Sequence, residues 1–127
     1  MKKIVETKDA PAPIGPYNQA VTLGNLAFVS GQIAIDPLTG KLVIDDIESE
    51  THQVMKNVEA VLKKAGFRWE DVLKASIFLA DMDQFPNVNK VYGSYFSDNY
   101  PARECVEVKK LPKGVNVEIS VIAGSEG

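Results

Sequence analysis

The sequence contains very few of the residues on which common catalytic centres depend. Among its 127 residues there is one cysteine, Cys105, and one histidine, His52. This excludes an internal disulfide, and it excludes a metal centre that needs several histidine or cysteine ligands. A Ser-His-Asp or Cys-His system would have to use that single imidazole, and the apolar stripe of the surrounding helical pattern leaves His52 facing solvent. Cys105 has no histidine near it in the sequence, which favours a small buried residue over a thiol nucleophile.

Phosphate-binding glycine loops, basic clusters and long apolar runs are absent as well. The nine glycines match neither G-x-G-x-x-G nor G-x-x-x-x-G-K, so we expect no nucleotide-binding loop and no cofactor. The net charge is −3 and the basic residues cluster only in pairs, which argues against a nucleic-acid surface. Because there is no apolar N-terminal segment or hydrophobic span, we expect a cytoplasmic protein that has no contact with a membrane.

What the sequence does have is enough apolar residues for one core. A chain of 127 residues with 45% hydrophobic content can bury about two thirds of its unfolded surface in a single domain, residues 1–127. Period-2 alternation predicts strands, and apolar residues at spacings of three and four predict two helices. The expected strands are 2–7, 17–23, 26–33, 72–80, 102–109 and 115–123, and the expected helices are 47–66 and 84–97.

This order of elements predicts an α+β fold, a single six-stranded mixed sheet with two helices packed on one face. The prolines between Ala10 and Pro16 indicate an ordered loop that leads to Tyr17. The other face of the sheet is left uncovered, so we expect the chain to cover it by self-association. The apolar strand residues on which this expectation rests are Val106, Val108, Val117, Ile119 and Val121.

Two charged residues in the last two strands stand out from their apolar neighbours. Alternation puts Arg103, Cys105 and Glu107 on one side of their strand. An arginine on a strand can anchor a small organic acid through two parallel hydrogen bonds, and an edge-strand salt bridge fits the spacing equally well. Glu118 also alternates with apolar residues, and a solvated strand carboxylate is the simpler interpretation. A hairpin centred near Pro112 would set Glu118 opposite Glu107 rather than Arg103.

Four blocks of sequence, spread over almost the whole chain, share one resemblance. They are Ala12-Pro13-Ile14-Gly15-Pro16-Tyr17-Asn18-Gln19-Ala20, then Phe28-Val29-Ser30-Gly31-Gln32-Ile33, then a middle block from Gly66 through Trp69-Glu70-Asp71-Val72 and Asp81-Met82 to Tyr92, and finally Pro101-Ala102-Arg103-Glu104-Cys105-Val106-Glu107-Val108 with Val117-Glu118-Ile119. In residues and order these blocks resemble the RidA (YjgF) family of reactive-intermediate imine and enamine deaminases. Four ordered blocks are far more specific than one short motif.

The resemblance implies a chorismate-mutase-like fold and a homotrimer, with the sheets facing inward and small-molecule clefts between neighbouring subunits. It also implies hydrolytic deamination of 2-imino acids, the tautomers of enamines such as 2-aminoacrylate and 2-aminocrotonate, to 2-oxo acids and ammonia. The expected activity is that of a 2-iminobutanoate/2-iminopropanoate deaminase, a hydrolase acting on C=N bonds, without a metal or cofactor.

Matched residue by residue, the resemblance implies a site. Arg103 would clamp the substrate carboxylate, Tyr17 would orient the imine, and Glu118 would position or deprotonate the attacking water. The implied substrate-binding residues are Ser30, Gly31, Asn89 and Cys105, with Gly31 and Cys105 acting through their backbone. Glu104 follows the arginine where many relatives carry Ser, Ala or Val. By alternation it should point away from Arg103.

Two other functions remain open on the sequence. The same cleft would suit a non-catalytic trimeric regulatory module that binds small carboxylates such as 2-oxo acids. Ribonuclease activity has been attributed to some members of the family, but an acidic chain without a catalytic histidine pair or a basic groove argues against it.

Overall fold

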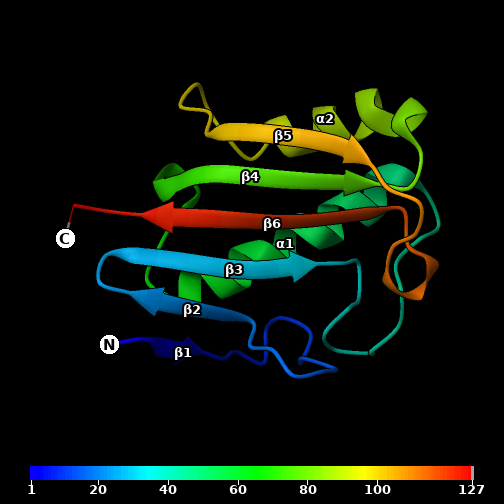
Figure 1. The fold of residues 1–127 in the computed structure, drawn as a ribbon. Helices are drawn as coiled ribbons and strands as arrows, with labels where there is room; N and C mark the ends of the chain where they lie inside the picture. The colour runs from blue at the N-terminus through cyan, green and yellow to red at the C-terminus, as the bar shows by residue number, and fades with distance from the viewer. Residues whose placement is uncertain (127) are drawn as a thin grey trace.

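The computed structural model, which describes residues 1–126, contains one six-stranded sheet with the strand order β1-β2-β3-β6-β4-β5 (Figure 1). Neighbouring strands are antiparallel except for the parallel pair β4 and β5. The sheet is therefore mixed, as the sequence predicts. The strands are β1 (Lys3–Val5), β2 (Ala20–Leu23), β3 (Leu26–Gln32), β4 (Val72–Leu79), β5 (Ala102–Glu107) and β6 (Val117–Gly124).

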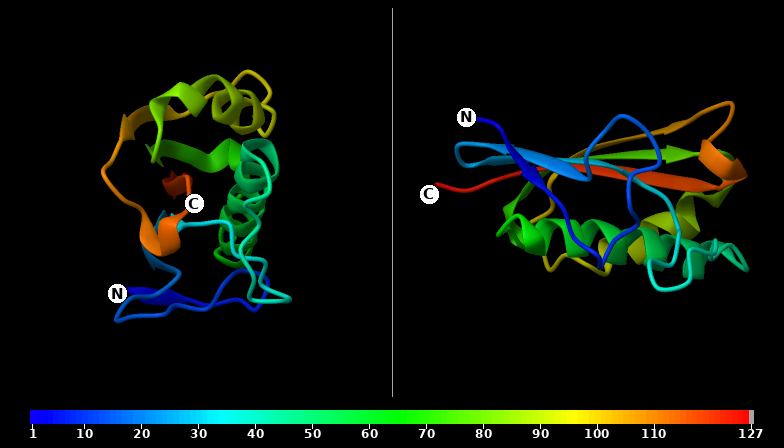
Figure 2. Two further views of the ribbon diagram at one scale, coloured as in Figure 1. Left: turned by 90° about the vertical axis from the view of Figure 1, so that its right-hand side faces the viewer. Right: turned by 90° about the horizontal axis from the view of Figure 1, so that it is seen from below.

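Two helices, α1 (Ile47–Lys64) and α2 (Phe85–Gly93), cover one face of this sheet (Figure 2). α1 buries an apolar stripe that includes Val54, Val58 and Val61, and this stripe packs against the inward side chains of the strands. The arrangement confirms the predicted α+β fold with both helices on one face. No helix in residues 1–126 has the length and apolar character needed to span a membrane.

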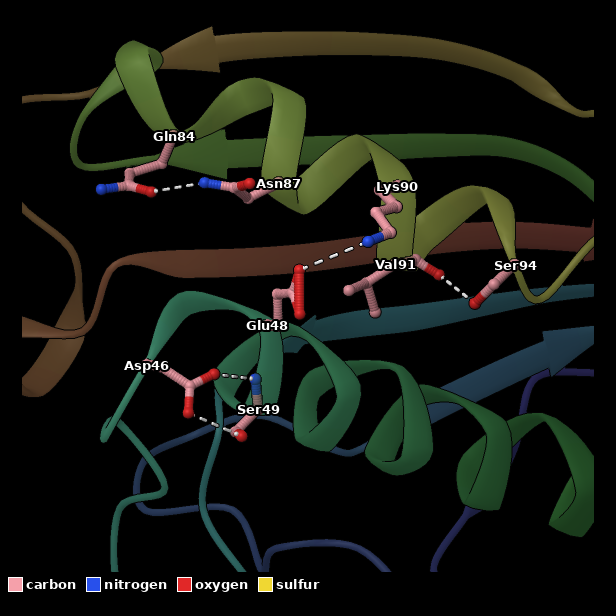
Figure 3. A network of polar contacts seen from close by, with 8 residues as sticks. All are labelled: Asp46, Glu48, Ser49, Gln84, Asn87, Lys90, Val91 and Ser94. Atoms are coloured by element: carbon pink, nitrogen blue, oxygen red, sulfur yellow. Dashed lines mark hydrogen bonds and ion pairs between the residues drawn. The ribbon is translucent and has the colours of Figure 1, made fainter.

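Polar contacts cap the N-terminus of α1 and connect its first turn to α2 (Figure 3). Asp46 caps α1, because its Oδ1 accepts a hydrogen bond from the Ser49 N–H at 2.8 Å. Glu48 in the first turn of α1 pairs with Lys90 of α2, with 3.8 Å between Oε1 and Nζ. Exposed ion pairs of this kind contribute little free energy, so apolar packing is what holds the two helices on the sheet.

β2 is shorter than the sequence predicts. It begins at Ala20 rather than at residue 17, and residues 17–19 belong to the preceding loop. The reason is the buried side chain of Gln19, whose Nε2 donates to the carbonyl oxygens of Ala10 and Pro11 at 3.2 and 2.8 Å. These bonds fold the loop back against the start of β2, so that Tyr17 lies outside the sheet.

α2 is also shorter than predicted, because it ends at Gly93 rather than at residue 97. Beyond Gly93 the N–H groups of Tyr95 and Phe96 bond to carbonyls three residues back, at 3.2 Å each. Such bonds belong to tighter 3₁₀-type turns. At the other end, a short 3₁₀ helix (Met82–Gln84) precedes α2, and its cap is Asp81.

β5 and β6 do not form a hairpin. β6 lies between β3 and β4, and β5 is an edge strand beside β4. Glu118 is in register with Phe78 of β4, so the pairing of Glu118 with Glu107 that a hairpin would give is wrong. The chain reaches β6 by passing the end of β4, where the Ala80 N–H donates to the Asn116 carbonyl at 3.0 Å.

The face of the sheet away from the helices exposes large apolar side chains. Ile4, Leu23, Phe28, Leu73 and Val106 on it are between 41% and 61% exposed. Several large exposed apolar side chains on one face are typical of a protein–protein interface. Of the residues on which the expectation of an apolar uncovered face rests, Val106 lies on this face, whereas Val117, Ile119 and Val121 are buried beneath the helices.

Candidate functional site

The carboxylate of Glu118 lies directly over Gly31 in the neighbouring strand. A Cβ atom at residue 31 would be only 2.5 Å from Glu118 Oε2 and 2.8 Å from its Cδ, so no larger residue fits beneath the carboxylate in this position. The pairing of β3 with β6 shifts between Val29 and Gln32, which indicates a β-bulge at Ser30 and Gly31. Bulges of this kind re-aim side chains and are frequent beside active sites.

Glu118 forms one wall of a pocket of about 390 Å³. The other lining residues come mainly from the loop before β2 and from the end of β3. They are Pro11, Ala12, Ile14, Tyr17, Gln19, Ser30, Gly31, Gln32, Ile33, Ile35 and Pro112. Most of this wall is apolar, and burial raises the pKa of Glu118 above the usual range for a glutamate. A carboxylate with a raised pKa exchanges protons more readily near neutral pH, which suits general acid-base chemistry.

Tyr17 and Ser30 contribute to this pocket in different ways. Tyr17 is 46% exposed, and its ring packs beside Gly15, where a Cβ atom would lie 3.7 Å from two ring carbons. The Ser30 hydroxyl donates to the Asn18 carbonyl at 2.6 Å, and so it ties the bulge of β3 to the loop next to Tyr17. Ser30 therefore has a structural partner within the subunit, whereas Tyr17 lines the pocket and is partly exposed.

Arg103 lies on the helix side of edge strand β5 and contacts α2. Its Nη1 donates to Asn89 Oδ1 at 2.6 Å, and its Cζ lies 5.3 Å from the ring centroids of both Phe85 and Tyr92. Contacts between a guanidinium group and aromatic rings at this distance are favourable. No carboxylate in residues 1–126 forms an ion pair with Arg103, so the edge-strand salt bridge that the spacing allowed is wrong.

The neighbours of Arg103 behave as alternation predicts. Cys105 is half-buried on the same side of β5, where burial raises the pKa of the thiol and the positive charge of Arg103 opposes this less strongly. The thiol is therefore not activated as a nucleophile. Glu104 points to the opposite side, where it accepts a hydrogen bond from Ser76 and pairs with Lys74 at 3.3 Å.

The predicted site residues gather in two places within the subunit. The first, the Glu118 pocket, contains Tyr17, Ser30, Gly31 and Glu118. The second, the Arg103 cluster, contains Phe85, Asn89, Tyr92, Arg103 and Cys105.

The two places lie on opposite faces of the sheet. Arg103 is in register with Ala75, which is buried beneath the helices, and Glu118 is in register with Phe78 on the other face. These two β4 positions are three residues apart, which is about 10 Å along a strand. One subunit therefore does not bring Arg103 and Glu118 to a common substrate.

His52 belongs to neither place. It is exposed, as the sequence predicts, but its Nδ1 lies 2.9 Å from the hydroxyl of Tyr95. This contact links α1 to the turns that follow α2.

Two contributions were missed by the sequence reasoning. The first is the contact of Phe85 and Tyr92 with Arg103. With Asn89, which the resemblance did imply, they have the spacing i, i+4 and i+7, which places all three on one helix face, and this signal predicts a common contact. Gln19 carries no such signal, because its partners lie eight to twelve residues away. A local pattern does not reveal hydrogen bonds across that distance.

The chain is similar in sequence to known proteins along nearly its whole length. A family model described as Endoribonuclease L-PSP matches residues 7–125. A 2-iminobutanoate/2-iminopropanoate deaminase of Salmonella typhimurium is 43% identical over an alignment of 126 residues that covers 97% of this chain and 98% of that protein.

Solved structures give the same result. A crystal structure of a putative endoribonuclease from Thermotoga maritima is 52% identical, covers 100% of both chains and superposes with a TM-score of 0.97. The crystal structure of E. coli TdcF with bound serine is 40% identical, with a TM-score of 0.93 over 98% of this chain and 99% of that chain.

Proposed function

The chain belongs to the RidA/YjgF/RutC family, and from this membership we propose that it hydrolyses 2-imino acids to 2-oxo acids and ammonia. The proposed activity is that of a 2-iminobutanoate/2-iminopropanoate deaminase, the name of the Salmonella relative at 43% identity. The family also includes a protein whose structure contains bound serine, a small amino acid with a carboxylate.

The observation that carries this proposal is that the structure holds two complementary groups, the carboxylate of Glu118 and the guanidinium of Arg103, in two different environments. Glu118 lies half-buried in a largely apolar pocket that raises its pKa, and Arg103 is held by Asn89 without an ion-pair partner in residues 1–126. The first group suits proton transfer to and from water. The second suits a carboxylate, because most donors of the guanidinium fork remain available for a bidentate contact.

We propose that the two groups meet between subunits of a homotrimer. Because Arg103 and Glu118 lie on opposite faces of the sheet, a substrate that contacts both must contact Arg103 of one protomer and Glu118 of its neighbour. The exposed apolar face supports association. The resemblance noted in the sequence implies three subunits with clefts between them.

In the proposed mechanism, Arg103 binds the carboxylate of the imino acid and Tyr17 orients the imine through its phenol. Glu118 accepts a proton from a water molecule whose oxygen attacks C2, so a C–O bond forms and the C=N bond becomes a C–N single bond. The protonated Glu118 then returns its proton to nitrogen. Glu118 then takes the proton of the new hydroxyl and passes it to the nitrogen, so the C–N bond breaks as the C=O bond forms and the products are ammonia and the 2-oxo acid. The imine carbon is already electrophilic, so positioning with modest acid-base assistance is sufficient.

An imine-trapping assay tests this proposal. An amino-acid oxidase generates 2-iminopropanoate and 2-iminobutanoate in situ, semicarbazide traps the imine that is not hydrolysed, and the wild type is compared with Arg103→Ala. We expect the wild type to suppress trapping and Arg103→Ala to lose on the order of 10²-fold to 10³-fold in kcat/KM, because a charge-assisted anchor is removed. Arg68→Ala serves as the matched control, because Arg68 is the other arginine of the chain and is exposed. This variant should retain activity.

Two outcomes would count against the deaminase. An Arg103→Ala protein that stays oligomeric with full hydrolysis would remove the proposed anchor. A folded wild type that binds 2-oxo acids without any turnover would favour the alternative function, a non-catalytic trimeric module that binds small carboxylates. Measuring binding by calorimetry alongside the assay separates these results.

A ribonuclease, as the family description suggests, has less support. The single histidine, His52, contacts Tyr95 and lies in neither the Glu118 pocket nor the Arg103 cluster. The net charge of −3 also disfavours the phosphate contacts on which affinity for RNA depends.

A further inference from the structure

Glu50 is a fully buried carboxylate on α1. No cation in residues 1–126 forms an ion pair with it, so its charge is compensated only by hydrogen bonds. Its Oε2 accepts from the N–H groups of Asn116 and Val117 at 2.7 and 3.2 Å, and its Oε1 accepts from Asn116 Nδ2 at 2.7 Å. All three donors belong to the two residues that immediately precede Glu118.

Within the part of the chain that the structure describes, the backbone at the start of β6 has no strand pairing on the side that faces β3. The pairing of β6 with β3 begins at Ile119, which is in register with Gln32, and the bulge at Ser30 and Gly31 follows. Glu118 itself is paired only with β4 on the other side. A strand end that lacks one neighbour and adjoins a bulge is free to shift unless another contact holds it.

We infer that Glu50 is a positioning residue that holds the start of β6 so that the carboxylate of Glu118 stays over Gly31. The inference rests on the proposed role of Glu118 in hydrolysis. Glu50 does not line the Glu118 pocket, and it acts from the helix side of the sheet through residues 116 and 117. A buried carboxylate without a cation is a costly way to fill a core position, since an apolar residue of similar size avoids the desolvation. Its hydrogen-bond geometry explains its presence better than core packing does.

The chemistry of glutamine provides a close control. In Glu50→Gln, the amide oxygen can accept the two backbone N–H groups that now bind Oε2. The amide nitrogen can then donate to Asn116, provided that the Asn116 side chain turns its oxygen toward it. All three hydrogen bonds are thus kept without a charge. In Glu50→Ala they are all lost, and in Asn116→Ala only one is lost.

The experiment compares these three variants with Val58→Ala, which removes buried methyl groups from the same helix about 12 Å along its axis from Glu50 and destabilises the core. We expect Glu50→Ala to lower kcat by about 10-fold to 100-fold with KM nearly unchanged, because the misplaced group is Glu118 and Arg103 is intact. Asn116→Ala should show a smaller loss, and Glu50→Gln should stay within about threefold of the wild type. Assays are run below the unfolding transition of each variant.

A second readout does not depend on activity. In glutamate-labelled protein, the ¹³C carboxyl signal of Glu118, assigned with Glu118→Gln, gives its titration midpoint. Tyr17 is the other titratable side chain among the described lining residues of the pocket. We expect the midpoint to fall toward that of an ordinary glutamate in Glu50→Ala, because the carboxylate leaves its half-buried position, and to stay unchanged in Glu50→Gln and Val58→Ala.

The two readouts separate the two ideas. If the wild type hydrolyses no imine, the proposed function fails, and the carboxyl titration still tests the positioning of Glu118. If Glu50→Ala leaves the titration of Glu118 unchanged, or if Val58→Ala lowers kcat as much as Glu50→Ala does, the positioning role is overturned.

Discussion

The Glu118 pocket and the Arg103 cluster hold their charged groups by different means. Glu118 lies near the start of an inner strand, where it is paired with β4 and the missing side chain of Gly31 in β3 leaves its carboxylate room. Arg103 sits on an edge strand, where aromatic rings and an amide from α2 hold a long side chain. The first group is placed by backbone geometry, and the second by side-chain contacts.

This difference has a consequence for function. A carboxylate that must have a raised pKa needs burial, which the inner strands and the loop before β2 provide. The proposed binding of a carboxylate by Arg103 needs free donors and a defined side-chain direction, which an edge position with one neutral partner provides. A single subunit thus builds both environments by keeping them on opposite faces, and association is what would combine them.

Glu118→Gln should have the largest effect, because it removes the proton-accepting group and leaves the Arg103 cluster intact. We expect kcat/KM to fall by about 10²-fold to 10⁴-fold. In the wild type, the acid limb of the pH profile of kcat/KM should have its midpoint above the ordinary glutamate pKa of about 4.3, since burial raises the pKa of Glu118.

The same substitution should raise stability at neutral pH. The pKa of Glu118 is raised in the folded state, so the folded state favours the protonated form. Its stabilising contribution is present below the ordinary glutamate pKa and is lost as pH rises through the raised value. Thermal unfolding between about pH 4 and pH 8 should therefore show a Tm advantage for Glu118→Gln that grows with pH. A variant that is less stable than the wild type at neutral pH would contradict the inferred cost of burying this carboxylate.

Mixing two inactive variants tests whether the two regions cooperate across subunits. In hetero-oligomers formed by refolding equal amounts of Arg103→Ala and Glu118→Gln, about one interface in four pairs an intact Arg103 with an intact Glu118. We expect about a quarter of the wild-type kcat per site to return, while each variant refolded alone stays inactive. A mixture that also stays inactive would overturn the proposal that Arg103 of one subunit and Glu118 of its neighbour act on the same substrate.

The sequence predicted much of each region but not the relation between them. Alternation correctly assigned Arg103 and Cys105 to one side of β5 and Glu104 to the other, because side-chain direction in a strand is a local property. The insertion of β4 between β5 and β6 is not local, and so the sequence did not reveal that the last two strands do not form a hairpin near Pro112. The same limit applies to β2, since the hydrogen bonds of Gln19 that shorten it reach across a loop.

The candidate site residues were predicted from a resemblance rather than from chemistry visible in the sequence. Nothing in the alternation around Gly31 indicates that a carboxylate from another strand lies on it. Nothing around Glu50 indicates that it binds residues 116 and 117. These contacts depend on tertiary structure. They explain how the Glu118 pocket is built, which the resemblance in sequence does not.

Gly31→Ala is expected to have an intermediate effect, confined to the Glu118 pocket. The added Cβ would lie 2.5 Å from Glu118 Oε2, so the carboxylate must move, and we expect kcat to fall by about 10-fold to 100-fold. Gly93→Ala at the end of α2 is the matched control, because a Cβ there meets no atom within 4 Å, and the change should stabilise the helix by about 0.5 to 1 kcal/mol. Circular dichroism and the imine assay compare the two. Equal activity in both would mean that the position of the carboxylate over Gly31 does not matter for hydrolysis.

Tyr92→Phe should have the smallest effect, and it isolates what the Arg103 cluster requires. The Tyr92 hydroxyl is buried without a hydrogen-bond partner in residues 1–126, and burial raises its pKa, with Arg103 opposing, so it remains a neutral phenol. Replacing an unpaired buried hydroxyl with hydrogen removes a desolvation penalty, and we expect the free energy of unfolding to stay the same or rise by up to about 1 kcal/mol. The ring that faces Arg103 is retained, so kcat/KM should change by less than about twofold. Tyr92→Leu, which removes the ring, should weaken substrate binding more than Tyr92→Phe does, as a rise in KM. If Tyr92→Phe alone raises KM strongly, the hydroxyl rather than the ring supports Arg103.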